Sequence, residues 1–338
     1  AYWLSHSTID CYKRYSKLDT ISEPRKGMVT ADNPRFIRFW YEVSFKKCGL
    51  NCMSREEAKK SQFKWFPYMK GGSYRKWFGN TDCVVNWEND GEELLNMKGN
   101  GYKTGSTNHN LNYIFKSAIV WTKITSAAPS FRYAPSGFLF DDASGLCVSK
   151  KKTYDMELNL LGFLNSTSAD HFLKATSPTL NLSPGELANL PVLNEINKSL
   201  IEKVHSSIEI AKEDWNAYEV SWSFRRPKIL IGDLISHEYS SLKVKKNKSW
   251  LLLKENEIFI NGYFRENYKL NADVEIDVKD KDITLKSNAL YLETSISNNK
   301  VADLRLQSKE LSYLVSYSIG CMMGRYSLDQ EGLVYAHA

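Results

Sequence analysis

A chain of 338 residues exceeds the usual size of one compact domain, so the sequence predicts two packed units. Apolar residues make up 42% and charged residues 25%, and no apolar run approaches the roughly 20 residues that a membrane span requires. The net charge of +6 and pI near 8.8 favour an acidic partner such as nucleic acid. We therefore expect a soluble protein with no membrane partner.

The ends and the cysteines give expectations about the setting of the chain. Six cysteines are scattered along it, unlike the dense framework of a small secreted domain, and this favours a reducing, cytoplasmic location. The first residues lack a basic start followed by an apolar run, so they predict no secretory signal. The chain begins without Met and within an amphipathic segment, which predicts a piece of something longer.

Short apolar runs between turn residues predict strands of a mixed or antiparallel sheet in the first half, at residues 36–43, 83–87, 118–124 and 137–140. Ser54 and Glu57 form a capping box that predicts a helix over the following residues, and a second short helix is expected at 91–97.

From about residue 155 the apolar period becomes helical, with Leu158, Leu161 and Leu164 on one face. Residues 193–211 predict a long amphipathic helix at the hinge between the units, with a stripe of Ile196, Leu200, Val204 and Ile208. Residues 304–319 predict another packed helix, whereas the order of 230–275 stays open. The expected fold class is α+β, a mixed or antiparallel sheet followed by a mainly helical region.

Residues 24–43 combine a polar turn with several cations, which suits a phosphate backbone or a base edge. The alternative is a hairpin with charged edges. Residues 63–80 interleave Lys70, Arg75 and Lys76 with aromatic residues that include Tyr74, and aromatic rings can stack on bases. The alternative is a buried aromatic hairpin whose basic residues alternate outward.

Motifs for chemistry within the chain are weak. The acidic run at 87–93 lacks the spacing of a calcium loop, Cys48 and Cys52 have no second ligand pair for zinc, and the six histidines are dispersed. A glycine-rich turn for S-adenosylmethionine and the Asn/Asp-Pro-Pro-aromatic motif that grips a flipped adenine are both missing. We expect no catalytic residue, metal or cofactor in these residues, and a standalone enzyme is the least favoured interpretation.

A series of blocks in fixed order carries a resemblance to a known family: RKGMVTADNPRFIRFWYEV, KWFPYMKGGSYRKWFGN, VVNWENDGEEL, FRYAPSGFLFD, LLGFLNSTSADHFLKATSPTLNLSPGELANLP, KEDWNAYEVSWSF and YSIGCMMGRYSLDQEGLVYA. This order resembles the carboxy-terminal half of the PglX family, the adenine-specific DNA methyltransferases of BREX phage-defence systems. The resemblance implies a target-recognition domain followed by a helical region. It places the catalytic domain, with its S-adenosylmethionine, amino-terminal to these blocks.

The leading hypothesis assigns residues 1–190 to a DNA target-recognition domain and 191–338 to a helical spacer and carboxy-terminal region that braces it against the methyltransferase domain. The expected DNA-contacting residues are Arg25, Lys26, Thr30, Asn33, Arg35, Lys70, Tyr74, Arg75, Lys76, Lys123 and Arg132. The alternative is a platform that docks other subunits of the defence complex. An exposed apolar patch on the helical half would favour docking, and a continuous basic face on the first half would favour double-stranded DNA.

Overall fold

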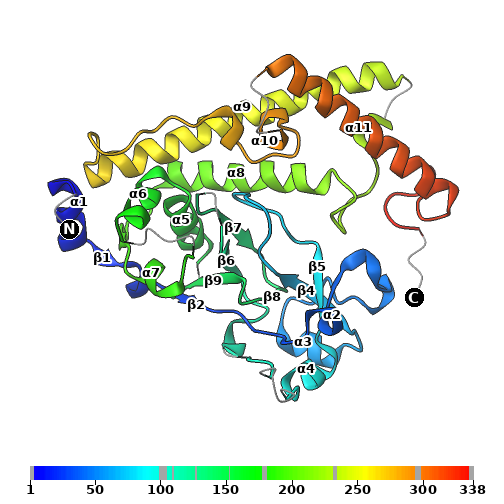
Figure 1. Cartoon of the computed structure of the whole chain (residues 1–338), viewed down its shortest axis with the longest axis horizontal. Helices are drawn as coiled ribbons and strands as arrows, with labels where there is room; N and C mark the ends of the chain where they lie inside the picture. The colour runs from blue at the N-terminus through cyan, green and yellow to red at the C-terminus, as the bar shows by residue number, and fades with distance from the viewer. Residues whose placement is uncertain are drawn as a thin grey trace.

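The computed structural model describes residues 4–98, 105–108, 110–125, 128–151, 153–176, 181–230, 234–293 and 298–334. Two four-stranded sheets with short helices form one side of the molecule, and a layer of long helices covers the other (Figure 1). Helix α1 (His6–Arg14) lies at one end of the long axis, and the carboxy-terminal end of α11 (Asn299–Met322) lies at the other. The predicted α+β class is confirmed.

One four-stranded sheet is antiparallel and the other is mixed, as expected. The first has the order β2-β9-β6-β7, spanning Ser22–Arg25, Ser144–Ser149, Ala118–Thr122 and Phe131–Ala134, with antiparallel neighbours. The second has the order β3-β5-β4-β8, spanning Ile37–Phe39, Cys83–Asn86, Trp65–Met69 and Leu139–Phe140, and its β4–β8 pair is parallel. A separate pair joins β1 (Ser16–Lys17) to β10 (Pro191–Val192).

Short helices connect these strands, and their sequence signals are local. The Ser54 hydroxyl accepts a hydrogen bond from the backbone N–H of Glu57, so the predicted helix start is confirmed. The Glu57 carboxylate accepts from Met53, one residue before the N–H that a capping box would use. The short helices are α2 (Asn33–Phe36), α3 (Arg55–Lys60), α4 (Glu88–Leu95) and α7 (Pro184–Ala188). Single 3-10 turns lie at Leu18–Thr20, Trp40–Glu42, Phe45–Lys47, Leu111–Tyr113, Lys228–Leu230 and Asp280–Asp282.

The helical layer is built on two long helices that run side by side, α8 (Lys198–Asn216) and α9 (Ile235–Tyr268) (Figure 1). Helices α5 (Tyr154–Leu164) and α6 (Thr167–Thr176) pack between this pair and the sheets, and α10 (Ala289–Leu292) precedes α11. The main apolar core joins α5, α6, α8 and α9 with residues of β6 and β9.

The predicted stripe of α8 is buried from Leu200 through Val204 to Ile208. Ile196 is half exposed and precedes the helix, because the Asn197 side chain accepts the Leu200 N–H and sets the helix start at Lys198. The predicted long amphipathic helix is therefore confirmed with a later start, and its role as a hinge stays a prediction.

Residues 230–275, whose order the sequence left open, contain one helix of 34 residues, α9. Its inward positions include the polar residues Asn256, Glu257 and Asn261, which are buried among hydrogen-bond partners and hide the apolar period. The division at residue 190 stays a prediction, and the main core contains residues from both sides of it.

Candidate nucleic-acid interface

The turn from Asp141 to Ala143 connects the ends of both four-stranded sheets. The Asp141 N–H donates to the carbonyl of Met69 at 2.9 Å, and the Asp142 N–H donates to that of Met28 at 2.9 Å. The Ala143 carbonyl accepts from the Lys123 N–H at 3.0 Å. Backbone pairing therefore brings the segments that follow β2, β4 and β6 to one edge of the molecule.

Three of the predicted contact residues meet at this edge. Lys26, which follows β2, is exposed, and Lys70, which follows β4, is half-buried. Neither forms an ion pair within the described residues. Lys123, which follows β6, binds the Asp142 carboxylate at 2.8 Å. Ammonium groups on three adjacent segments form a cationic edge suited to a phosphate backbone.

A buried carboxyl group fixes the geometry of this edge. Asp141 accepts the Tyr68 hydroxyl at 2.9 Å and the Ala143 N–H at 2.8 Å. Burial raises the pKa of the Asp141 carboxyl above its ordinary value, and these hydrogen bonds oppose the rise. The turn is thus held by its own side chain, so the three lysines lie on a rigid support.

Arg25 lies beside the cationic edge at the end of β2. Its guanidinium binds the Glu23 carboxylate at 3.0 Å and stacks 5.7 Å from the centre of the Tyr113 ring. Asn110, a residue that the sequence analysis did not select, donates from its side-chain amide to the Lys26 carbonyl at 3.0 Å. The backbone of Asn110 has a positive φ of 67°, which an Asn in a polar loop tolerates. The hydrogen bond from its side chain holds the backbone between Arg25 and Lys26 in place.

The remaining residues of segment 24–43 follow the same edge onto α2. Thr30 is buried, and its hydroxyl donates to the side-chain oxygen of Asn33 at 2.6 Å. Asn33 is exposed at the start of α2, with its side-chain NH₂ left for an outside acceptor. Arg35 is also exposed, and its Nε donates to the Glu93 carboxylate at 2.8 Å. Thr30 therefore orients the Asn33 side chain and is itself too buried to contact DNA.

The structure places the other predicted residues inside the molecule, against the helical layer. Arg75 is 1% exposed. Its guanidinium donates to the carbonyls of Phe78 and Ala211 at 2.7 and 3.1 Å and to the carboxylate of Asp214 at 2.9 Å. It also stacks 5.1 Å from the centre of the Trp215 ring. Three of its five N–H groups thereby bind α8 or its own loop.

Lys76 and Trp77 share one carboxylate of α9. The Lys76 ammonium donates to Glu257 at 2.8 Å, and the Trp77 indole N–H donates to the other oxygen of Glu257 at 2.7 Å. The Lys76 backbone N–H binds the Thr284 hydroxyl at 3.0 Å, and the Tyr74 carbonyl accepts the Tyr291 hydroxyl. We call residues 74–77 the clamp, because each of these bonds fastens the sheets to the helical layer.

Arg132 lies behind the clamp on β7 and is fully buried. It donates to the Arg75 carbonyl at 3.3 Å. Burial and the charge of Arg75 lower the pKa of the Arg132 guanidinium to about 10.

The positions of Arg75, Lys76 and Arg132 correct their expected place on a DNA-contact surface, because their charged groups face the protein interior. Tyr74 is half-buried, and its expected contact with DNA stays a prediction. The hairpin alternative for segment 63–80 expected outward cations, and that orientation is corrected for Arg75 and Lys76.

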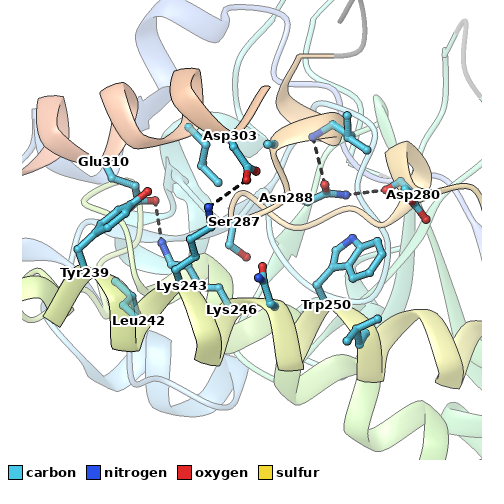
Figure 2. A pocket seen from close by; sticks show the side chains of 15 residues that line it. Tyr239, Leu242, Lys243, Lys246, Trp250, Asp280, Ser287, Asn288, Asp303 and Glu310 are labelled. Atoms are coloured by element: carbon cyan, nitrogen blue, oxygen red, sulfur yellow. Dashed lines mark hydrogen bonds and ion pairs between the residues drawn. The ribbon is translucent and has the colours of Figure 1, made fainter. Parts of the chain in front are cut away.

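A pocket of about 320 Å³ lies between α9, α10 and α11 (Figure 2). Lys243 and Lys246 project from α9 and bind Asp303 and Glu310 of α11 at 3.0 and 2.8 Å. Opposite charges are paired across the pocket, so we interpret it as the seam that fastens α11 to α9.

Two curated bacterial proteins match the chain over nearly its whole length. An adenine-specific methyltransferase PglX of Lacticaseibacillus casei (strain Zhang) is 34% identical over 348 residues, which covers 99% of this chain. An adenine-specific methyltransferase BrxX of Escherichia coli O9:H4 (strain HS) is 35% identical over 340 residues and covers 100%. Over these residues, the chain is similar to PglX-type adenine-specific methyltransferases. The resemblance carried by the sequence blocks is thus confirmed.

The match covers only part of the relatives. The chain spans about a quarter of their length, 27% of the PglX protein and 26% of the BrxX protein. No family model matches the chain. Among the residues that the structure describes, none of the helices is long and apolar enough to cross a lipid bilayer. The same residues contain no group of three or more His, Cys, Asp or Glu side chains placed to hold a metal ion.

Proposed function

We propose that this chain reads the DNA target of a site-specific adenine-N6 DNA methyltransferase in a phage-defence system of the BREX type. The relatives supply the link to adenine methylation, because both are named adenine-specific methyltransferases. The catalytic domain and its S-adenosylmethionine then belong to the part of such an enzyme outside these 338 residues. The chain contributes recognition of double-stranded DNA.

The observation that carries this proposal is the cationic edge at the Asp141–Ala143 turn. Lys26, Lys70 and Lys123 come from three separate segments, yet backbone pairing aligns them on one rigid border. Phosphate contacts dominate the affinity of DNA-binding proteins and position them on the duplex. Arg25 and Arg35 extend the same border and are held by single surface carboxylates, which a phosphate can replace at small cost.

Base reading in this proposal falls to Asn33. An Asn side chain can bind adenine through both its oxygen and its NH₂ group, and Asn33 is exposed at the border with its NH₂ group available. The hydrogen bond from the Thr30 hydroxyl to the side-chain oxygen of Asn33 fixes the orientation of that amide. The helical layer holds the recognition sheets through the clamp and faces the rest of the methyltransferase, or other subunits of the defence complex.

A titration of duplex DNA over a range of salt tests the electrostatic part. The logarithm of the binding constant should fall with the logarithm of salt concentration, with a slope of about −0.9 for each phosphate neutralised. Lys26→Ala, Lys70→Ala and Lys123→Ala should each make the slope shallower by about 0.9. Lys174→Ala is the matched control, because Lys174 is an exposed lysine on α6, away from the border. A slope that none of the three border variants changes contradicts the proposal.

Base reading is tested in a methyltransferase that carries this chain together with its catalytic domain. We expect Asn33→Ala to relax the choice of base at one position of the methylated site, while overall DNA binding weakens little. Mapping the methylated adenines across a genome gives the result. A variant that methylates the same site with unchanged stringency removes Asn33 from base recognition.

A further inference from the structure

Helix α11 buries Ala302 and Tyr317 on its inner face, yet its outer face leaves a row of large apolar side chains exposed. Its inner face carries Asp303 and Glu310, which bind lysines of α9 across the pocket (Figure 2). Its outer face carries large apolar side chains at spacings of three, four or seven residues, all at least 41% exposed: Val301, Leu304, Leu311, Val315, Ile319 and Met322. A surface helix of a globular protein normally exposes polar residues on its outer face. The sequence predicted that this helix packs, and the structure packs Tyr317 but leaves these six side chains largely exposed within the described residues.

The carboxy-terminal half of α11 also has no charge on any side. Residues 311–323 contain neither acid nor base, and serines separate the large apolar residues. Small side chains between apolar ones allow another element to approach closely. A helix that is apolar all round is usually buried in its complete assembly.

The exposed apolar surface continues onto the sheet side of the molecule. The Trp40 indole N–H donates to the Val220 carbonyl at 2.9 Å, and the Ser316 hydroxyl of α11 donates to the neighbouring Glu219 carboxylate at 2.8 Å. The loop at residues 219–220 thus connects segment 39–45 with the end of α11, and the two lie together at the same end of the molecule in Figure 1. Around Trp40 lie three exposed aromatic residues: Phe39, Tyr41 and Phe45.

The aromatic part of this surface is already ordered. The rings of Phe39 and Tyr41 are stacked, with centres 5.3 Å apart and an angle of 6° between their planes. We call the outer face of α11 from Val315 to Met322, together with Phe39, Tyr41 and Phe45, the apolar corner. Aromatic and methionine side chains of this kind are enriched at protein interfaces.

Cations outnumber the carboxylates at the rim of the apolar corner. Lys46, Lys47 and Arg325 are exposed, and none forms an ion pair within the described residues. The nearby carboxylates are those of Glu42, which accepts the Phe39 N–H, and Glu219, which accepts the Ser316 hydroxyl. A two-fold dimer through this corner would set the cations of one copy close to those of the other, which opposes self-association. The centre of the corner offers no charge to phosphates, which opposes DNA. A partner with an apolar centre and an acidic rim matches both features.

We propose that the apolar corner docks against the rest of a PglX-type methyltransferase, on a surface that is apolar at its centre and acidic at its rim. The chain spans about a quarter of the length of its curated relatives, so a PglX-type enzyme has a large further body available as this partner. Because both the sheets and α11 contribute to the corner, docking there fixes the cationic edge relative to the catalytic domain. The inference rests on the proposed function in taking that partner to be the methyltransferase body.

Photo-crosslinking in a methyltransferase that carries this chain with the remaining sequence tests the contact. A p-benzoylphenylalanine placed at Ile319 should crosslink to peptides from outside these 338 residues of the same molecule. The matched control is Ile196, which is also 50% exposed and lies at the start of the helical layer, before α8. Crosslinks from position 319 to a second copy of the protein or to DNA overturn the proposal. A crosslinking yield at position 319 no higher than that at position 196 overturns it as well.

A charged double variant separates docking from DNA reading. Val315→Lys with Ile319→Lys should lower methylation by about tenfold or more, since buried apolar anchors dominate interface affinity. Its salt slope for duplex DNA should equal that of the wild type, because both sites lie away from the cationic edge. Normal methylation by this variant contradicts docking at the corner. If the DNA affinity of the wild type does not change with salt concentration, the DNA proposal is contradicted. The crosslinking result alone then decides whether the apolar corner docks on the methyltransferase body.

Discussion

Replacement of Glu257 by leucine tests the clamp, which joins the sheets to the helical layer. The side chain of Glu257 is 2% exposed and that of Lys76 is 13% exposed, so removal of the carboxylate leaves a buried ammonium group without a counter-ion. Although burial lowers the pKa of Lys76, the charge of Glu257 outweighs it and holds that pKa above its ordinary value. Lys76 therefore stays charged at neutral pH.

The expected cost follows from these positions. Breaking a buried ion pair from one side costs about 3–5 kcal/mol, and the loss of the acceptor for the Trp77 indole N–H lies within that total. A double variant, Lys76→Met with Glu257→Leu, replaces the pair with apolar groups and should recover all but about 1–3 kcal/mol, the cost of the unsatisfied indole N–H.

Urea unfolding of the four proteins of this cycle at pH 7 measures the free energies of unfolding and the coupling between the two sites. Lys174→Ala, which breaks an exposed pair with Asp170, is the control and should cost less than about 1 kcal/mol. A loss below about 1 kcal/mol for Glu257→Leu, or additive effects of the two substitutions, would refute the assignment of residues 74–77 as a clamp.

Two further predictions concern the core. Burial raises the pKa of the Glu157 carboxyl above 4.5, so the native state loses stability as pH rises through that pKa. The free energy of unfolding of Glu157→Gln, measured in urea at each pH, should therefore increase relative to that of the wild type between pH 4 and 7. An alanine at Gly145 would place its Cβ about 2.0 Å from the Trp121 ring, and Gly145→Ala should lower the unfolding free energy by about 1–3 kcal/mol, seen as a lower Tm. A constant stability difference across pH, or an unchanged Tm, contradicts the respective argument.

Local signals in the sequence predicted local structure well. The Ser54 N-cap marks the start of α3, and the apolar period from Leu200 to Ile208 marks the buried face of α8. The same reasoning left α9 open, because its buried positions include Asn256, which binds the Ser206 hydroxyl from α8. A polar side chain with a distant partner breaks the apolar period that sequence reasoning depends on.

The candidate site shows the same limit for charges. Lys26 and Lys76 look alike in sequence, each a lysine near aromatic or polar turn residues. The carboxylate that binds Lys76 lies 181 residues away, and the one that binds Arg75 lies 139 residues away. Only the packing of α8 and α9 against the sheets distinguishes a cation that is neutralised inside the protein from one available for phosphate.

The clamp also bears on how new target specificities can arise by recombination between relatives. A chimera that exchanges residues 63–80 as one unit would import a foreign Arg75 and Lys76 against the resident Asp214 and Glu257. Grafts that end before Tyr74 keep that junction matched while they can still replace Lys26 and Lys70 of the cationic edge. Viable hybrids, natural or engineered, should therefore have crossover points on the amino-terminal side of the clamp, or inherit its acidic partners together with it.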